Sequence, residues 1–423
     1  MTESPTVVDM FCGAGGESCG IKQAADNANI DISMYAINHW EQAIETHKIN
    51  FPTAEHICRD VQDINPSEVI EGREVALLWA SPACTHFSVA RGGKPCDNQS
   101  RITPFTILDW LDKLTVDRVI IENVPEFQSW GPLDKNTLRP IQKAKGETFS
   151  AFVGMIRGLG YSVDWKVLNA ADYGAPTTRR RLFIQAVRND TDKSIIWPEA
   201  THTKPTYNQT LTKIKSWIPA RDIIDWSIPT QIIDERTKPL SPNTMKRIMH
   251  GIEKYWGTYA TSFIIRYNGG ENRVHSIDEP LPVLDTSNRY GLIQPLLMEY
   301  YGQSGCHPIS TKPVPAISTN IHFAIVEPLI MEYHGNGGCH PVSKPLPTVT
   351  GNDRFALITQ ENVRIGFRML KPHELAAAQS FPRDYIFTGT RGDVVKQIGN
   401  AVCPKVSQAL CAGYMQELAE GVS

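Results

Sequence analysis

The sequence lacks the features of membrane, secreted and disulfide-stabilised proteins. No apolar run approaches the roughly 20 residues of a membrane-spanning helix, and Met1–Pro5 has neither the basic region nor the apolar core of a secretory signal. The nine cysteines are odd in number, scattered along the chain, and form no Cys-x-x-Cys pair. This usage favours a reducing cytoplasm over a disulfide framework. We therefore expect a cytoplasmic protein that has no membrane segment and binds no metal.

A strong excess of either charge is also missing. The chain has 42 Lys and Arg against 45 Asp and Glu, a net charge of -3, which excludes a wholly basic nucleic-acid-binding protein. Local basic clusters such as Arg179–Arg181 remain compatible with phosphate contacts. The length of 423 residues is enough for two or three domains, and the 41% hydrophobic content is ordinary for a globular protein.

Short apolar runs alternate with helical patterns from Val7 to about Val187. This alternation predicts a mostly parallel, doubly wound sheet. The predicted strands are Val7–Met10, Tyr35–Asn38, Ala76–Ala80, Val119–Glu122, Val163–Leu168 and Leu182–Val187, and the predicted helices lie near Glu41–Ile49, Thr106–Leu114 and Ser150–Leu159. In such sheets, ligands bind outside the carboxyl ends of the strands.

Three features that could bind a ligand or take part in a reaction lie at predicted strand ends. They are the Gly-rich turn Asp9–Gly16, the thiol of Cys84 and the carboxylate of Glu122. Each has a plain structural reading: Asp9 could cap the next helix, Cys84 could be a buried thiol, and Glu122 could form a salt bridge. Because all three meet at one edge of the sheet, we predict a single site for covalent chemistry beside a nucleotide-like cofactor.

Beyond about residue 188 the composition shifts toward Pro, Thr and aromatic residues. An internal repeat spans 263–359, with copies that open at Phe263, Leu296 and Leu329, at intervals of 33 residues. Each copy continues through a Gly-rich turn and a Pro-x-Pro element to a polar loop and an apolar strand. We expect a small β-rich domain, in which the repeat acts either as a scaffold or as a reading surface.

Two further segments complete the sequence-based picture. Cys306-His307 and Cys339-His340 occupy equivalent repeat positions, and we interpret them as duplicated turn residues rather than as a zinc site, because they have no CxxC or HxxxH companion. Near the C-terminus, Lys371–Leu375 is predicted to start a helix, and an amphipathic helix over Lys405–Leu418 is predicted to pack on the first domain.

Taken together, and in this order, the motifs resemble those of the cytosine carbon-5 DNA methyltransferases, over nearly the whole chain. Asp9–Gly16 resembles the family's cofactor turn, Ser81–Cys84 its nucleophile loop, and Glu122–Val124 its acidic triplet. Further similar segments are Asn38–Trp40, Arg59–Val61, Leu168–Arg181, Thr348-Val349 and Gln397–Val402.

The chain departs from the family pattern at four positions. His39 stands where the family has an acidic ribose ligand, and Thr177 replaces a Gln in the segment before the two arginines. Ala83 and Thr85 flank the thiol in place of Pro and Gln.

The resemblance implies a Rossmann-like, doubly wound catalytic domain over 1–195, completed by 396–423, and a smaller β-rich target-recognition domain over 196–395. It implies S-adenosyl-L-methionine as cofactor and double-stranded DNA as partner, with a monomeric enzyme of bacterial or phage origin and a companion restriction endonuclease. The implied catalytic residues are Cys84, Glu122, Arg179 and Arg181, and the implied cofactor-binding residues are Asp9, Phe11, Gly13, Gly15, His39, Trp40, Asp60, Pro82, Asn400 and Val402.

By this resemblance, the reaction is methyl transfer to carbon 5 of a cytosine flipped out of the duplex, through a covalent adduct with Cys84. Two alternatives stay open: a tRNA cytosine methyltransferase with the same catalytic set, and a DNA-binding homologue that has lost activity.

Overall fold

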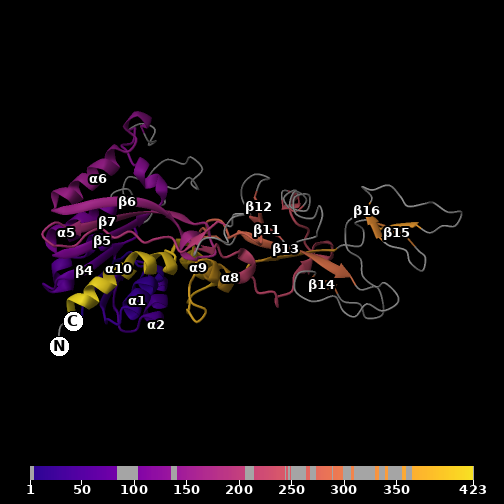
Figure 1. Ribbon diagram of the computed structural model, residues 1–423, viewed down its shortest axis with the longest axis horizontal. Coiled ribbons are helices and arrows are strands. Elements are labelled where there is room, and N and C mark those ends of the chain that lie inside the picture. Colours follow the sequence, from indigo (N-terminus) through magenta and orange to yellow (C-terminus); the bar gives the residue numbers. More distant parts are fainter. Residues whose placement is uncertain are drawn as a thin grey trace. The chain divides into compact units, whose positions relative to one another are not determined.

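The structure is a computed structural model. It describes residues 4–82, 103–134, 141–204, 214–242, 244, 245, 248, 263–266, 273–287, 289–298, 306–308, 329–332, 339–341, 355–358 and 364–422. Contacts divide the chain into two units (Figure 1). The first comprises Met1–Ile218, Pro280–Ser287 and Leu375–Ser423, and the second Pro219–Glu279 and Asn288–Glu374. The sequence-based division grouped 196–218, 280–287 and 375–395 with the recognition region, whereas the contacts of these segments lie in the first unit.

The first unit is built on a seven-stranded sheet with the order β3-β2-β1-β4-β5-β7-β6. Its strands are β1 (Thr6–Met10), β2 (Ser33–Asn38), β3 (Glu55–Cys58), β4 (Val75–Ala80), β5 (Val116–Asn123), β6 (Tyr161–Asn169) and β7 (Arg180–Arg188). The pairs from β3 to β5 are parallel, and β7 pairs antiparallel with both β5 and β6. The predicted mostly parallel, doubly wound sheet is therefore confirmed.

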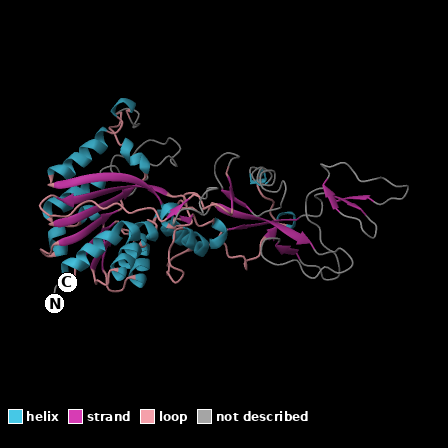
Figure 2. Cartoon of the chain, viewed as in Figure 1, coloured by secondary structure: helices cyan, strands magenta, loops and turns pink. Residues whose placement is uncertain are grey.

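Helices cover both faces of this sheet (Figures 1 and 2). Residues of α3 (Pro66–Ile70), α5 (Thr106–Lys113) and α6 (Glu147–Gly158) pack into one buried apolar cluster. Residues of α1 (Gly16–Asn27) and α10 (Pro404–Val422) form a second cluster on the opposite face. Along β1, Val8 belongs to the first cluster and Val7 to the second, as strand alternation requires. The same alternation places Asp9 on the α1 and α10 face.

The remaining elements of the first unit connect or extend these layers. They are α2 (Glu41–Asn50), α9 (Arg391–Asn400), the two-residue strands β8 (His202–Thr203) and β9 (Lys215–Ser216), and the 3₁₀ helices η1 (Val61–Asp63), η3 (Thr103–Phe105), η4 (Pro125–Ser129), η5 (Gln142–Ala144) and η6 (Ala170–Tyr173). In α2, which lies where a helix was predicted near Glu41–Ile49, Ile44 is buried while Glu41, Glu45 and Lys48 are exposed. The helix α8 (Pro372–Ala378) begins one residue after Lys371, where a helix start was predicted.

The second unit is rich in antiparallel strands. One sheet has the order β10-β18-β13-β11-β12, with β14 added to β13. Its strands are β10 (Gln231–Ile232), β11 (Phe263–Arg266), β12 (Val274–Ser276), β13 (Tyr290–Met298), β14 (Cys306–Pro308) and β18 (Arg364–Met369). A second, three-stranded sheet contains β15 (Leu329–Glu332), β16 (Cys339–Pro341) and β17 (Phe355–Ile358), and the 3₁₀ helices of this unit are η8 (Ala220–Ile223) and η9 (Ile233–Glu235).

The internal repeat is visible in the strand pairing. Leu296 pairs with Pro308, and Leu329 pairs with Pro341, so the second and third copies form matching hairpins. The first copy forms the corresponding hairpin between β11 and β12. The three copies are thus β-rich units, as predicted, and the described strands of the third belong to a sheet of their own.

None of the helices in the described part of the chain combines the length and apolar character of a bilayer-spanning segment.

Candidate active site at the carboxyl edge of the sheet

The described residues that were predicted for the site lie mainly where neighbouring strands of the first unit end. Met10, the last residue of β1, pairs with Ile37 on β2 and with Ala80, the last residue of β4. Ala80 in turn pairs with Ile121, one residue before Glu122 on β5. Because these strands are parallel, the segments that follow them emerge at one edge. The register therefore brings the turn after β1, residues 81–82 after β4, and Glu122 on β5 to one edge of the sheet. Cys84 itself lies outside the described residues.

The turn between β1 and α1 has an unusual backbone. Phe11, Gly13 and Gly15 have φ angles of 65°, 50° and 87°, in the left-handed region that glycine tolerates best. A Cβ atom on Gly15 would lie 2.8 Å from the Tyr385 hydroxyl and 2.9 Å from the His47 ring. Gly15 is therefore required by both its conformation and its packing, whereas at Gly13 the nearest atom, the Phe11 carbonyl oxygen, would lie 3.9 Å away.

Asp9 lies directly before this turn and is fully buried. Its Oδ2 accepts a hydrogen bond from the Ser18 hydroxyl, while Gly15 is the N-cap of α1 and no side chain caps that helix. The helix-capping reading of Asp9 is therefore wrong. Burial raises the pKa of Asp9 to about 8, and the Ser18 hydrogen bond offsets only part of that effect.

Partly accessible groups line the ends of β1 to β3. Phe11 and Trp40 are half-buried, and His39 and Asp60 are exposed. Asp60 Oδ1 accepts a hydrogen bond from the Gln62 amide at 3.1 Å. The ammonium of Lys396, on α9, lies 4.1 Å from the centroid of the Trp40 ring, a cation–π contact.

The segment after α9 closes the same region from the other side. Val402 is buried and Asn400 is exposed. A Cβ atom on Gly16 would lie 2.2 Å from the Val402 carbonyl oxygen, so the start of α1 and the 400–403 segment touch through backbone. Three features of this edge fit a ligand that carries an aromatic ring and a positive charge: aromatic faces, an exposed carboxylate, and a buried Asp9 carboxylate oxygen that has no hydrogen-bond partner among the described residues.

Glu122 and Arg181 form an ion pair on neighbouring strands. Glu122 lies opposite Phe183 in the β5–β7 ladder, and the Nε atom of Arg181 lies 2.9 Å from Oε1 of Glu122, with side-chain exposures of 13% and 10%. A guanidinium held by a carboxylate in a largely dry setting keeps other N–H donors available for a planar polar ligand.

The start of the Cys84 loop is fixed to this pair by Asn123. The Asn123 side-chain amide donates to the carbonyl of buried Pro82 at 3.3 Å, and its oxygen accepts from the Val124 amide at 2.9 Å. Asn123 thus ties the loop that leads to Cys84 to the strand that carries Glu122.

Arg179 is arranged differently from Arg181. It is only 4% exposed, and its Nη1 atom donates to the carbonyls of Leu284 and Gly399, each at 3.0 Å. The Thr178 amide donates to the Leu281 carbonyl at 2.7 Å, and the Leu281 amide to the Pro176 carbonyl at 2.9 Å. Arg179 therefore holds the segment 280–287 and the end of α9 in place.

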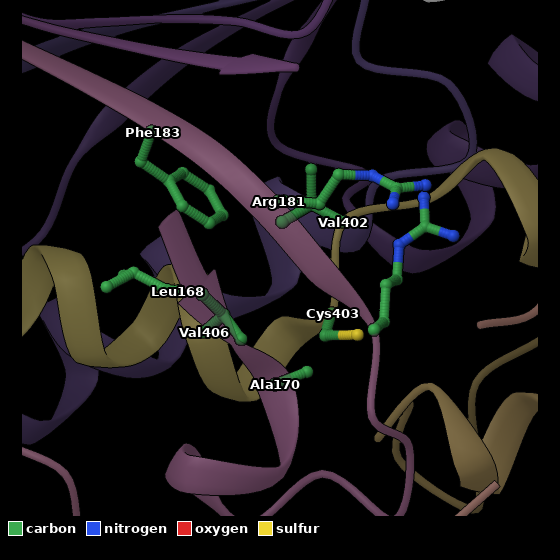
Figure 3. Close-up of a pocket in the computed structure, with 8 residues that line it drawn as sticks. Leu168, Ala170, Arg181, Phe183, Val402, Cys403 and Val406 are labelled. Atoms are coloured by element: carbon green, nitrogen blue, oxygen red, sulfur yellow. The ribbon is translucent and has the colours of Figure 1, made fainter. Parts of the chain in front are cut away.

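Arg179 and Arg181 both line a pocket, and Figure 3 shows Arg181 with the apolar side chains around it. Its lining is otherwise mostly apolar and comes from β6, β7 and the start of α10, with Leu168, Ala170, Arg179, Arg181, Phe183, Val402, Cys403 and Val406 around it. Burial raises the pKa of the Cys403 thiol to about 11, against the lowering effect of both arginines, and the thiol donates to Gln379. Cys403 is therefore a structural thiol rather than a nucleophile.

A family model of the C-5 cytosine-specific DNA methylases matches residues 5–415. The chain belongs to this family. Type II methyltransferase M1.HphI of Haemophilus parahaemolyticus is 25% identical over 418 residues, which are 98% of this chain and 87% of that protein. Type II methyltransferase M.MthTI of Methanothermobacter thermautotrophicus is 23% identical over 98% of both chains. The activity of the chain is DNA cytosine-5 methylation. The family match and these relatives do not favour the two alternatives, a tRNA methyltransferase and an inactive homologue.

Solved structures share the fold. A putative DNA modification methyltransferase encoded within an E. coli prophage superposes with a TM-score of 0.52 at 18% identity, and covers 98% of this chain and 99% of its own. A Spodoptera frugiperda DNMT2 mutant also gives 0.52, at 16% identity and 99% coverage of both chains.

Several residues that contact the predicted site residues carry no sequence signal of their own. Lys396 immediately precedes the matched segment Gln397–Val402, yet only the fold brings it onto Trp40. Ser18 on α1 bonds to Asp9, and His47 on α2 bonds to Ser18, contacts that only the fold creates. The role of Asn123 was available in principle, since it is the middle residue of the acidic triplet.

Proposed function

We propose that the protein is a DNA (cytosine-5-)-methyltransferase that acts on a flipped cytosine in a specific duplex sequence through a covalent adduct with Cys84. The Glu122–Arg181 ion pair, fixed by Asn123 beside the start of the Cys84 loop, is the observation that carries this proposal. A carboxyl group and a guanidinium on one edge match the ring nitrogen and the carbonyl of a cytosine.

Carbon 5 of cytosine is a poor nucleophile, and the chemistry follows from that. Attack of the Cys84 thiolate on carbon 6 forms a C–S bond and makes carbon 5 enamine-like. Glu122 holds or protonates ring nitrogen 3, and Arg181 binds the ring carbonyl, so that both stabilise the charge that develops. Once carbon 5 carries the methyl group, its proton is lost to solvent and the C–S bond breaks, so that Cys84 leaves as a thiolate and the ring double bond is restored. Arg179, through its bonds to Leu284 and Gly399, positions this site rather than touching the base.

S-adenosyl-L-methionine supplies the methyl group when it is bound. We assign its contacts to Phe11, Gly13 and Gly15 at the first turn, to His39, Trp40 and Asp60 at the next two strand ends, and to Asp9, Pro82, Asn400 and Val402. The half-buried rings of Phe11 and Trp40 support adenine binding. His39 offers imidazole nitrogens for ribose hydroxyls in place of the family's carboxylate.

The second unit is the part that we assign to target recognition. Flipping a base costs a few kcal/mol, which protein–DNA contacts must offset, and the repeated hairpins supply a surface on which such contacts can form. We further propose that the enzyme acts as a monomer in a bacterial or phage-infected cytoplasm, with a restriction endonuclease as its companion.

The decisive experiment is a covalent trap. Duplex DNA with a mechanism-based cytosine analogue should form a denaturation-resistant adduct with the wild-type protein and with the control Cys96→Ser, but not with Cys84→Ser. Full turnover by Cys84→Ser would overturn the mechanism. Methyl transfer from labelled cofactor to tRNA, with none to duplex DNA, would refute the assignment of duplex DNA as the substrate. Bisulfite sequencing of DNA from expressing cells then gives the recognition sequence.

A further inference from the structure

A chain of hydrogen-bonded side chains connects the buried carboxyl of Asp9 with the edge of the sheet. Asp9 Oδ2 bonds to the Ser18 hydroxyl on α1. The Ser18 oxygen lies 2.9 Å from Nε2 of His47 on α2, and Nδ1 of His47 lies 2.8 Å from Nε2 of His56. His56 is half-buried on β3, the edge strand of the seven-stranded sheet. The chain therefore runs without a break from a fully buried acid to a partly accessible imidazole.

This chain can be polarised in either direction. With Asp9 protonated, the carboxyl donates to Ser18, Ser18 donates to His47 Nε2, and His47 Nδ1–H donates to His56 Nε2. With Asp9 ionised, each donor becomes an acceptor: Ser18 donates to Asp9, His47 Nε2–H to Ser18, and His56 Nε2–H to His47 Nδ1. Passing between the two states moves one proton along each bond and releases one proton to water from Nδ1 of His56. No heavy atom has to move.

The surroundings of Asp9 contain acids and no described counter-ion. Its Oδ1 atom is buried without a hydrogen-bond partner among the described residues. The titratable groups that face it are Cys12 in the turn, Glu17 on α1, Tyr385 after α8 and Cys411 on α10, with His47 reached through Ser18.

Burial dominates the pKa of every group in this cluster. It raises the pKa of Asp9 to about 8 and that of Glu17 well above its ordinary value, in each case against weaker hydrogen-bond effects. It lowers the pKa of His47 to about 3, so His47 is neutral and serves as a relay by exchanging tautomers. Asp9 is thus the acid of the relay that titrates near neutral pH.

We propose that Asp9 couples cofactor binding to proton release: it is protonated in the free enzyme, and it loses its proton through Ser18, His47 and His56 when a positively charged group of the cofactor binds at the adjacent turn. The inference rests on the proposed cofactor. Two groups of S-adenosyl-L-methionine carry that charge, the amino group and the sulfonium. The product, S-adenosyl-L-homocysteine, keeps only the amino group.

The number of protons released on cofactor binding follows from the pKa of Asp9. A carboxyl with a pKa near 8 is mostly protonated at pH 7, so binding can release most of one proton there. An opposite charge nearby favours the ionised form. The cofactor dissociation constant should therefore fall as pH rises toward 8, by up to about tenfold for each pH unit. Above about pH 9, both the release and this slope should disappear.

The test is calorimetric titration of the full chain with S-adenosyl-L-methionine at pH 7, in buffers of different ionisation enthalpy. We expect binding heats that vary with the buffer by an amount equal to most of one proton released. Asp9→Asn should bind with buffer-independent heat, and Asp26→Asn, on an exposed site of α1, should behave as the wild type. Titration with S-adenosyl-L-homocysteine separates the charges: equal release identifies the amino group, and loss of release identifies the sulfonium.

Two outcomes overturn the proposal, and they can be told apart. Binding with buffer-independent heat in the wild type refutes the proton linkage and leaves the cofactor assignment standing. An absence of binding refutes both.

Infrared difference spectra of the wild type give a check that does not depend on how the variants fold. In the difference spectrum, the unchanged band of protonated Glu17 cancels, and a loss of one protonated-carboxyl carbonyl band, that of Asp9, should remain. A difference spectrum without such a loss overturns the proposal. The route is tested by stopped-flow detection of the proton with a pH indicator. Ser18→Ala should release as many protons as the wild type but more slowly, and an unchanged rate excludes the relay.

Discussion

Replacement of Arg179 by methionine should loosen one defined segment of the first unit. The guanidinium is the donor for two carbonyls, those of Leu284 and Gly399, each at 3.0 Å. A buried acceptor left unpaired costs about 1–3 kcal/mol, so the variant should lose roughly 2–6 kcal/mol of unfolding free energy. Native domains have only about 5–15 kcal/mol in total, which makes the loss measurable by denaturant titration.

Hydrogen exchange can locate the damage. The amide of Thr178 donates to Leu281, and the amide of Leu281 donates to Pro176. Both amides should exchange faster in Arg179→Met, because the segment 280–287 loses its anchor. Arg180→Met is the matched control: Arg180 is exposed, and its removal should change stability by less than about 0.5 kcal/mol. Unchanged exchange at Thr178 and Leu281 would refute the assignment of Arg179 as a clamp.

Three further predictions concern the site and its support. Glu122→Gln should lower the rate of methyl transfer about 10²–10⁴-fold in a single-turnover assay, because the group that holds or protonates ring nitrogen 3 is lost. Gly399→Ala would place a Cβ atom 2.1 Å from the Asp285 carbonyl oxygen and should lower the free energy of unfolding in a denaturant titration. The control Gly154→Ala, at an open helical position, should raise the free energy of unfolding by about 0.5–1 kcal/mol. Because the pKa of Asp9 is raised from 3.8 to about 8, its contribution to the stability of the cofactor-free protein is complete below pH 3.8 and is lost as pH rises to about 8; Asp9→Asn should flatten that part of the stability curve.

The parallel sheet could be predicted because its strands are short apolar runs that end in glycine, proline or polar residues. β4, for example, is completely buried, and its sequence has no competing periodicity. The strand β3 was missed because Glu55–Cys58 carries exposed and half-buried residues on an edge of the sheet, so it shows no continuous apolar run. The sequence around α1 was interpreted only as a cofactor turn, although its buried Ile21, Ala24 and Ala25 show helical spacing.

At the site, too, residues in local sequence motifs could be predicted, and contacts made by tertiary packing could not. Glu122 was predicted from a local motif, and its partner Arg181 from a second motif about 60 residues on. The segment 280–287 was grouped with the recognition region because it is part of the repeat. Its docking depends on Thr178, Arg179 and Gly399, and none of these contacts leaves a trace in the sequence of the segment itself. Contacts of this kind depend on tertiary packing, which a single sequence does not encode locally.

The matched hairpins of the second unit have a consequence for how such a gene can change. The first and third copies pair in corresponding registers, Ile264 with Leu292 and Ile330 with Leu357. The described strands of the third copy pair with one another in a sheet of their own, whereas the first copy contains the segment 280–287, which Arg179 holds in the first unit. Loss or duplication of the third copy would therefore leave the sheet that carries Glu122 and Arg181, and the contacts of Arg179, unchanged. The second unit could then change in length without altering the proposed chemistry.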